Sequence, residues 1–308
     1  MGQTTGIKWT DATGNFWWGC QRVSPGCENC YAEQLATVRR KLPVWGPPKT
    51  TRRDRKKDVW TDIVKWNAAA AREGRRLKVF VSSMADVFED HPQVAPWRDE
   101  ALALLAGLTS LDVQLLTKRP ENITRMVPPA WLAPGGWPAH VWVGTTVEDQ
   151  KRADERIPHL LAVPARVRFL SCEPMIEAVN LEAAFCVYDR HGEPSGPRCN
   201  ADGSPAISWV IIGGESGSDA RPFAAEWARD ILTQCDEAGV AAFMKQFGDN
   251  PTTTLPNDET WPTHSPDGSG VQFVNGDGFG RYCVRGLGHH GADPSKWPVQ
   301  YRVQRFPK

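Results

Sequence analysis

Three cysteines early in the chain are the residues whose types and spacing most clearly predict chemistry. Cys20, Cys27 and Cys30 form a C-x6-C-x2-C pattern, with Pro25-Gly26 as a turn between the first thiol and the other two. Thiolates bind iron and zinc, so three of them can hold three corners of a [4Fe–4S] cube or three positions around a zinc ion. The pattern therefore indicates a metal centre.

The missing fourth ligand separates the alternatives. The next cysteine is Cys172, and no histidine lies near the three thiols in the sequence. A structural zinc site normally has four protein ligands, whereas a cube held by three thiolates leaves one iron open to a small molecule. S-adenosylmethionine (SAM), which chelates iron through its amino and carboxylate groups, requires such an open iron. The other readings are a zinc site completed by a distant histidine or cysteine, and three buried thiols without metal.

A repeated strand and helix pattern must position these thiols. Short apolar runs, which suit strands buried on both faces, alternate with helical periodicity over 94–108, 148–162 and 224–238. This alternation is typical of successive βαβ units. The predicted strands are 78–83, 113–117, 141–145, 167–171, 209–213 and 241–244, with a first strand at Phe16-Trp17-Trp18 and a first helix from about Tyr31 to Lys41.

Polar residues follow each of the six later strands, and this favours one architecture. In a (β/α) barrel all strand tips open onto one mouth, but in an open doubly wound sheet only those at the switch point share a site. We therefore expect a partial (β/α) barrel of six to seven parallel strands. The sequence identifies no catalytic residue. The tips supply SAM-binding candidates Ser82, Ser83, Asp86, Lys118, Arg119, Thr145, Glu148, Glu173 and Glu215, and substrate-binding candidates Lys245 and Gln246.

These tips also have plainer structural explanations. Lys118 and Arg119 end a buried strand and suit a carboxylate or phosphate; the alternative is a surface pair before a helix that starts at Pro120. The three glutamates can stabilise helix N-termini instead of binding a ligand. Gly213-Gly214 suits close approach to a ligand or a tight turn. Cys172 suits a buried structural position better than a role in radical chemistry.

Two insertions and a C-terminal extension interrupt the alternation. We expect the barrel over 1–248, with insertions at 42–77 and 187–206, and an irregular extension over 249–308 packed on it. The first insertion holds basic residues that suit either nucleic-acid phosphates or a solvated loop: Lys49, Arg52, Arg53, Arg55, Lys56 and Lys57. A second metal site would draw on Cys186, Cys199, Cys283 and His289 or His290.

Composition excludes several classes of protein. The 308 residues include 36 Lys plus Arg and 36 Asp plus Glu, and zero net charge argues against nonspecific binding to DNA or anionic membranes. With 41% hydrophobic residues, the chain is not disordered. No window approaches a membrane span, and the first residues lack the order of a secretory signal. We expect a cytoplasmic protein with no membrane partner, whose eight cysteines stay reduced.

Short motifs over roughly residues 7–248 carry a resemblance to a known family. They lie at 7–13, 19–33, 81–88, 116–121, 143–150, 153–158, 169–174, 209–217 and 243–248. The chain resembles phage- and prophage-associated radical-SAM-like proteins known as a domain of unknown function. The resemblance implies a radical SAM type of barrel with a [4Fe–4S] cluster on the three cysteines, but no substrate. Radical SAM enzymes at large usually have C-x3-C-x2-C, and their Gly-Gly-Glu segment follows the second strand; here Gly213-Gly214-Glu215 follows the sixth.

The expected function is therefore that of an enzyme. One electron from a reductant such as flavodoxin or ferredoxin would cleave SAM to methionine and a 5′-deoxyadenosyl radical, which abstracts hydrogen from a substrate. A nucleic-acid base or modified nucleotide is the expected substrate class. The alternative is a non-catalytic zinc- or cluster-binding protein that recognises nucleic acid with salt-sensitive affinity. A metal-dependent hydrolase is disfavoured because no strand tip carries a histidine.

Overall fold

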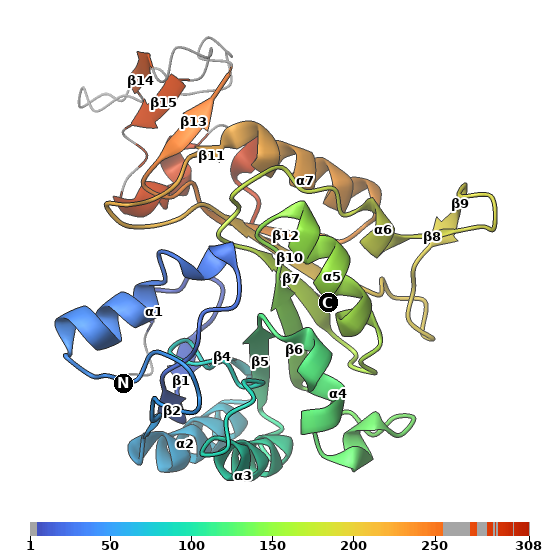
Figure 1. Cartoon of the computed structure of the whole chain (residues 1–308). Coiled ribbons are helices and arrows are strands. Elements are labelled where there is room, and N and C mark those ends of the chain that lie inside the picture. Colours follow the sequence, from blue (N-terminus) through green and yellow to red (C-terminus); the bar gives the residue numbers. More distant parts are fainter. Residues whose placement is uncertain are drawn as a thin grey trace. The chain divides into compact units, whose positions relative to one another are not determined.

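The computed structural model describes residues 5–254, 272–275, 282–285, 287, 289–297 and 299–307. The chain divides into two compact units. The first unit comprises Met1–Thr146 and Glu155–Phe169, and the second comprises Val147–Asp154 and Leu170–Lys308. Figure 1 labels their elements in chain order. Within the described ranges, no helix is both long enough and apolar enough to cross a bilayer.

The largest sheet in the described part of the chain has seven strands in the order β1-β4-β5-β6-β7-β10-β12 (Figure 1). This order rises along the chain without reversal, so the sheet lacks the switch point of a doubly wound fold. The pairs β1–β4, β4–β5, β5–β6 and β10–β12 are parallel. The protein therefore has an α/β fold with the strand order of a partial barrel. The strands are β1 (Ala12–Gly14), β4 (Leu77–Val81), β5 (Leu111–Thr117), β6 (Val141–Thr146), β7 (Arg168–Cys172), β10 (Trp209–Gly213) and β12 (Ala241–Gln246).

The six later strands predicted from the apolar runs are confirmed as β4, β5, β6, β7, β10 and β12. All residues of β6, β7 and β10 are buried, which explains the apolar runs in their sequences. The predicted crossover helices are confirmed as α3, α5 and α7. The helices are α2 (Asp58–Arg72), α3 (Ala95–Ala106), α4 (Ile123–Met126), α5 (Gln150–Leu161), α6 (Glu182–Phe185) and α7 (Ala225–Glu237).

The prediction of a first sheet strand at Phe16-Trp17-Trp18 is wrong. Strand β1 pairs with β4 instead, while β2 (Trp17–Trp18) pairs antiparallel with β3 (Asp54–Arg55) in a separate ribbon. The side chains of Phe16, Trp17 and Trp18 are buried. Their apolar character therefore indicates burial, but it does not show that the segment belongs to the main sheet. Strand β1 consists of small residues, and a Cβ on Gly14 would make ordinary contacts, 3.5 Å from Val81 and 3.6 Å from Ile63.

The second unit adds two small sheets. The insertion predicted as a loop at 187–206 contains most of a hairpin, β8 (Cys186–Tyr188) with β9 (Pro194–Pro197). The C-terminal region contributes to a four-stranded sheet in the order β11-β13-β15-β14. Its strands are β11 (Phe223–Ala224), β13 (Pro251–Thr253), β14 (Gln272–Asn275) and β15 (Tyr282–Arg285). The side chain of Cys283 lies outside the described part of the chain.

Candidate functional site

The segment that carries the three cysteines, residues 19–31, which we call the cysteine loop, is attached to the carboxyl end of β4. The backbone N–H of Gly19 donates to the carbonyl of Met84 at 3.0 Å, and the Tyr31 hydroxyl donates to the carbonyl of Ser83 at 2.9 Å. Gly19 has a φ of 114°, and a Cβ there would lie 2.3 Å from the carbonyl oxygen of Val44. The loop therefore requires glycine at its start.

The three thiols occupy different local settings, and all are half-buried. Cys20 follows β2, Cys27 ends a short 3-10 turn, and Cys30 is the N-cap of helix α1 (Tyr31–Glu33). The helix predicted from Tyr31 continues as a π-helical stretch, Gln34–Arg39. Cys30 packs against a small apolar cluster beneath the loop, formed by Trp18, Ala32, Ala36, Val44 and Met84.

Cations at the tip of β5 lie beside two of the sulfurs. Arg119 Nη1 donates to Cys20 Sγ at 3.7 Å, and its Nη2 donates to the carbonyl of Gln21 at 2.8 Å. Burial raises the pKa of the Cys20 thiol to about 12, and Arg119 opposes this rise. Burial also raises the pKa of Cys30, opposed by backbone N–H groups of α1 and by the charge of Lys118. Such cations and N–H groups stabilise thiolates.

Asp86 holds the tip of β5 in place. Its carboxylate accepts hydrogen bonds from Thr117 Oγ1 at 2.7 Å, from the Lys118 backbone at 3.1 Å and from Arg119 Nη1 at 2.7 Å. A fourth bond comes from the backbone of Phe88 at 3.0 Å. The carboxylate is thus engaged by four donors, and it orients Arg119 toward the cysteine loop.

A second buried ion pair, which the sequence analysis missed, supports the same loop. Arg53 Nε and Nη2 bind the two oxygens of Glu89 at 2.9 and 2.8 Å, and their side chains are 0% and 1% exposed. Arg53 also donates to the carbonyls of Val44 and Gly46. Glu89 Oε1 lies 3.9 Å from Arg119 Nη2, so the two pairs form one network. No local signal marks this partnership, because Arg53 and Glu89 are 36 residues apart.

The basic residues of the first insertion divide into two groups. Besides Arg53, two more make contacts within the fold. Arg55 lies 4.7 Å over the ring of Trp60, and Lys56 lies 4.4 Å over the ring of Trp18. Arg55 also forms an ion pair with Glu100 on the surface. The remaining three are exposed: Lys49, Arg52 and Lys57.

The other predicted residues of the first unit differ in their bonding. The side chains of Ser83 and Asn15 are hydrogen-bonded at 3.0 Å, and the Thr145 hydroxyl donates to the carbonyl of Thr117 at 2.9 Å, which joins β5 to β6. Ser82 is 2% exposed, and its hydroxyl has no hydrogen-bond partner among the described residues. Buried hydroxyls are nearly always paired, so a bound ligand at this tip would satisfy Ser82.

In the second unit, the predicted carboxylates at two tips are already paired. Lys245 forms an ion pair with Glu173, so a substrate-binding candidate and a SAM-binding candidate bind each other. Glu215 accepts from the backbone of Arg221 at 2.9 Å and from its Nε at 3.0 Å. These contacts neutralise both glutamates within the unit.

The remaining predicted residues of the second unit are tightly packed. Gln246 Nε2 donates to the carbonyl of Gly214 at 2.9 Å. A Cβ on Gly214 would lie 2.4 Å from the carbonyl oxygen of Phe247, so this glycine permits close packing of the chain on itself. Glu148 and Cys172 are fully buried, as predicted for the cysteine, and burial raises the pKa of the Cys172 thiol.

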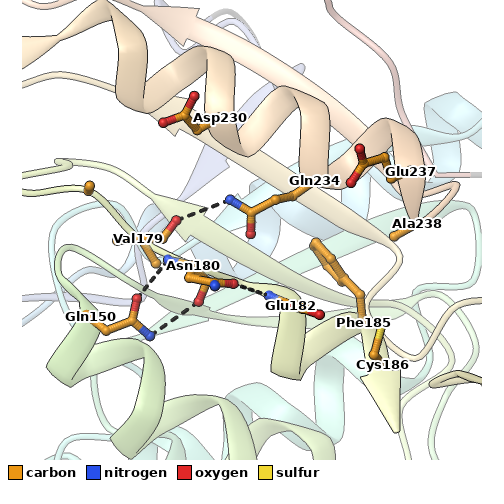
Figure 2. A pocket seen from close by; sticks show the side chains of 11 residues that line it. Gln150, Val179, Asn180, Glu182, Phe185, Cys186, Asp230, Gln234, Glu237 and Ala238 are labelled. Atoms are coloured by element: carbon orange, nitrogen blue, oxygen red, sulfur yellow. Dashed lines mark hydrogen bonds between the residues drawn. The ribbon is translucent and has the colours of Figure 1, made fainter. Parts of the chain in front are cut away.

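A pocket of about 670 Å³ in the second unit contains none of the predicted SAM- or substrate-binding residues (Figure 2). Two of the side-chain amides that line it are hydrogen-bonded to the protein backbone. Gln150 Oε1 accepts from the backbone of Asn180, and Gln234 Nε2 donates to the carbonyl of Val179. Three acidic residues also line the pocket: Glu182, Asp230 and Glu237. The cysteine loop is therefore the better candidate for a functional site.

The residue types of the cysteine loop are those of a thiolate-held cluster, but the structure does not gather the three thiols as a metal would require. The thiols come from one short segment, Arg119 and Lys118 supply positive charge, and Ser82 offers an unsatisfied hydroxyl beside the loop's attachment point. Across the ranges that the structure describes, no three His, Cys, Asp or Glu side chains are gathered closely enough to hold a metal ion.

The comparisons with known proteins identify a family but no activity. No curated protein and no solved structure matches the chain. A match to the family described as "Protein of unknown function (DUF5131)" covers residues 4–277, which is most of the chain. The protein therefore belongs to the DUF5131 family.

Proposed function

We propose that this protein is a radical SAM enzyme in which Cys20, Cys27 and Cys30 hold a [4Fe–4S] cluster with one iron left for SAM. The position of the cysteine loop carries this proposal. The loop is attached to the carboxyl ends of β4 and β5, and a sheet with barrel strand order builds its active site at these ends.

Cations and N–H groups around the loop offset part of the penalty that burial places on thiolates. When bound, the cluster and SAM supply reductive cleavage of SAM to methionine and a 5′-deoxyadenosyl radical that abstracts hydrogen from a substrate. Burial raises the pKa of Cys20 and of Cys30; Arg119 opposes this rise at Cys20, and Lys118 and the N–H groups of α1 oppose it at Cys30. Flavodoxin or ferredoxin suits the role of electron donor.

Two residues at the tips of β4 and β5 are the best candidates to bind SAM. Lys118 Nζ donates to Thr146 Oγ1 at 3.3 Å and, among the described residues, has no carboxylate partner, so it suits the SAM carboxylate. The unsatisfied Ser82 hydroxyl suits a polar group of the same molecule. Glu173 and Glu215 are weaker candidates because their charges are already neutralised.

The proposed substrate class is a nucleic-acid base or modified nucleotide. The exposed cations Lys49, Arg52 and Lys57 lie on a segment that is tied to the cysteine loop, because the Gly46 backbone donates to the carbonyl of Cys20 at 3.0 Å. Phosphate contacts from such residues position a nucleic acid without reading its sequence. They would hold a nucleotide near the proposed cluster.

The test is anaerobic reconstitution with iron and sulfide, reduction with dithionite, and addition of SAM. We expect an EPR signal that shifts when SAM is added, together with formation of 5′-deoxyadenosine. Cys27→Ala should abolish both. The matched control is Cys199→Ala, which removes an exposed cysteine of the second unit and should leave both unchanged.

The alternative function predicts a different result. Tightly bound zinc, with no cluster and no response to SAM, would refute the radical SAM proposal. It would leave a zinc-bearing protein whose affinity for nucleic acid should fall steeply with salt.

A further inference from the structure

In the second unit, the C-terminal segment brings a histidine to the carboxyl end of β12, a strand tip that has none of its own. The backbone N–H of Gly248 donates to the carbonyl of His290 at 3.0 Å, and the N–H of Phe247 donates to the carbonyl of Gly291 at 3.1 Å. The Gly291 carbonyl also accepts from Nε1 of the fully buried Trp297 at 3.0 Å. His290 is therefore held in place directly after the strand.

The side chain of His290 is bonded to that of Asp249. His290 Nδ1 lies 2.6 Å from Asp249 Oδ2, and the same oxygen accepts from the backbone N–H of Gly217 at 2.6 Å. A carboxylate accepts hydrogen bonds, so the neutral ring carries its proton on Nδ1 and its lone pair on Nε2. Among the described residues Nε2 has no hydrogen-bond partner, and the side chain is 38% exposed. Water can therefore reach the basic nitrogen.

The backbone and a stacked ring fix this arrangement. The ring centroids of His289 and His290 are 3.7 Å apart, and the backbone N–H of Asp249 donates to the carbonyl of Glu215 at 2.8 Å. His290 has a φ of 54°, in the left-handed region that residues other than glycine seldom adopt. Strain of this kind persists where surrounding contacts impose it, and such positions cluster at functional sites.

We infer that Asp249 and His290 form a proton-transfer dyad, in which His290 is the general base that activates water for hydrolysis of a carboxylic ester. Nε2 removes a proton from water while the water oxygen bonds to the acyl carbon. The bond from that carbon to the leaving oxygen then breaks, and His290 returns the proton to the leaving oxygen. Asp249 is a positioning residue, because it holds the Nδ1 proton and stabilises the imidazolium that forms.

The charges of the second unit favour an acyl substrate over a phosphate. Phosphoryl transfer depends on cations that neutralise the transferred group. Arg221 is engaged by Glu215, to which its Nε donates at 3.0 Å, and Lys245 is engaged by Glu173. Both cations are thus already neutralised, whereas ester hydrolysis needs a base and water. The inference is separate from the proposed function, since it requires neither the cysteine loop nor SAM.

The experiment measures hydrolysis of p-nitrophenyl acetate by the full-length protein in EDTA, without added iron, sulfide or SAM. His290→Gln should lower kcat/KM about 100-fold or more. Asp249→Asn should lower kcat at least about tenfold and leave KM unchanged. His191→Gln, which removes an exposed histidine of the same unit, is the matched control and should change nothing. Hydrolysis should also be slower in deuterium oxide, because a proton moves in the slow step.

A second measurement reports the state of the ring without any substrate. Nitrogen-15 NMR of the histidine side chains distinguishes the two neutral tautomers. In the unmodified protein, neutral His290 should carry its proton on Nδ1. Asp249→Asn should shift it toward the form with the proton on Nε2, which cannot accept a proton from water there. Should His290→Gln fail to fold, this measurement decides.

Several outcomes would overturn the inference: no hydrolysis by the unmodified protein, equal rates for His290→Gln, loss of hydrolysis on adding EDTA, an unchanged rate in deuterium oxide, or a neutral His290 protonated on Nε2. These failures would leave the proposed function untouched. Conversely, a protein that assembles no cluster would overturn the proposed function but not this inference.

Discussion

The buried pair of Arg53 and Glu89 makes a strong prediction about stability. Glu89→Gln would keep the shape of the side chain but remove its charge, leaving the guanidinium of Arg53 buried and uncompensated. Because both side chains are at most 1% exposed, water cannot replace the lost partner. Removing one member of a buried ion pair costs about 3–5 kcal/mol. We expect this loss in the free energy of unfolding.

The assay is equilibrium unfolding in urea, followed by tryptophan fluorescence. With a slope of about 3 kcal/mol/M for a chain of this size, the midpoint should fall by about 1 M or more. Glu100→Gln is the matched control, because its partner Arg55 lies on the surface, with side chains 39% (Arg55) and 55% (Glu100) exposed. We expect it to cost at most about 1 kcal/mol.

Salt gives an independent check of the same reasoning. In 1 M sodium chloride the effect of Glu100→Gln should vanish, but that of Glu89→Gln should persist because the pair is buried. Equal costs for the two substitutions, or a cost below about 1 kcal/mol for Glu89→Gln, would refute the claim that this network supports the loop. If Glu89→Gln does not fold, Arg53→Lys, which keeps the charge but loses the fork, provides the comparison.

Three further predictions concern single residues. Gly19→Ala should destabilise the protein by about 1–3 kcal/mol in the same urea assay, because its Cβ would meet the carbonyl of Val44 at 2.3 Å at a positive φ; an unchanged midpoint would contradict this. In metal-free protein at pH 8, iodoacetamide should modify Cys20 at least 100-fold more slowly than exposed Cys199, since the pKa of Cys20 is raised to about 12; similar rates by mass spectrometry would contradict this raised pKa. Burial tends to raise the pKa of Glu226, but hydrogen bonds from neighbouring threonines lower it overall, so its stabilising effect is present above the usual glutamate pKa and is lost as the pH falls through the lowered value. Glu226→Gln should therefore flatten the acid limb of a plot of melting temperature against pH, and an unaltered limb would count against these bonds.

The sequence by itself determined the main course of the chain. The six later strands could be predicted because strands buried on both faces contain long apolar runs, and β6, β7 and β10 are buried at every residue. The first strand could not, because β1 is only three residues long and two of them, Ala12 and Gly14, are of types depleted in strands. Parallel pairing with β4 makes this segment a strand, and that pairing exists only in the folded protein.

The sequence also identified the polar tips, because the side chains that follow parallel strands must meet at one edge of a sheet. Only the tertiary structure decided which of them bind one another. The register that pairs Val81 with Leu115 brings Asp86 next to Arg119, 33 residues away in the chain. Charges predicted to face a ligand then neutralise each other, as in the pair of Lys245 and Glu173.

For the cysteine loop too, the sequence identified some features and only the tertiary structure decided others. Its thiols were evident as candidates from spacing alone, since residues within one short segment can be recognised without knowledge of the rest of the fold. The role of Arg53 beside this loop was not evident, because in the sequence Arg53 looks like one cation among six in a basic segment. Its burial against Glu89 depends on the packing of two segments that are far apart in sequence, and spacing and composition carry no record of that packing.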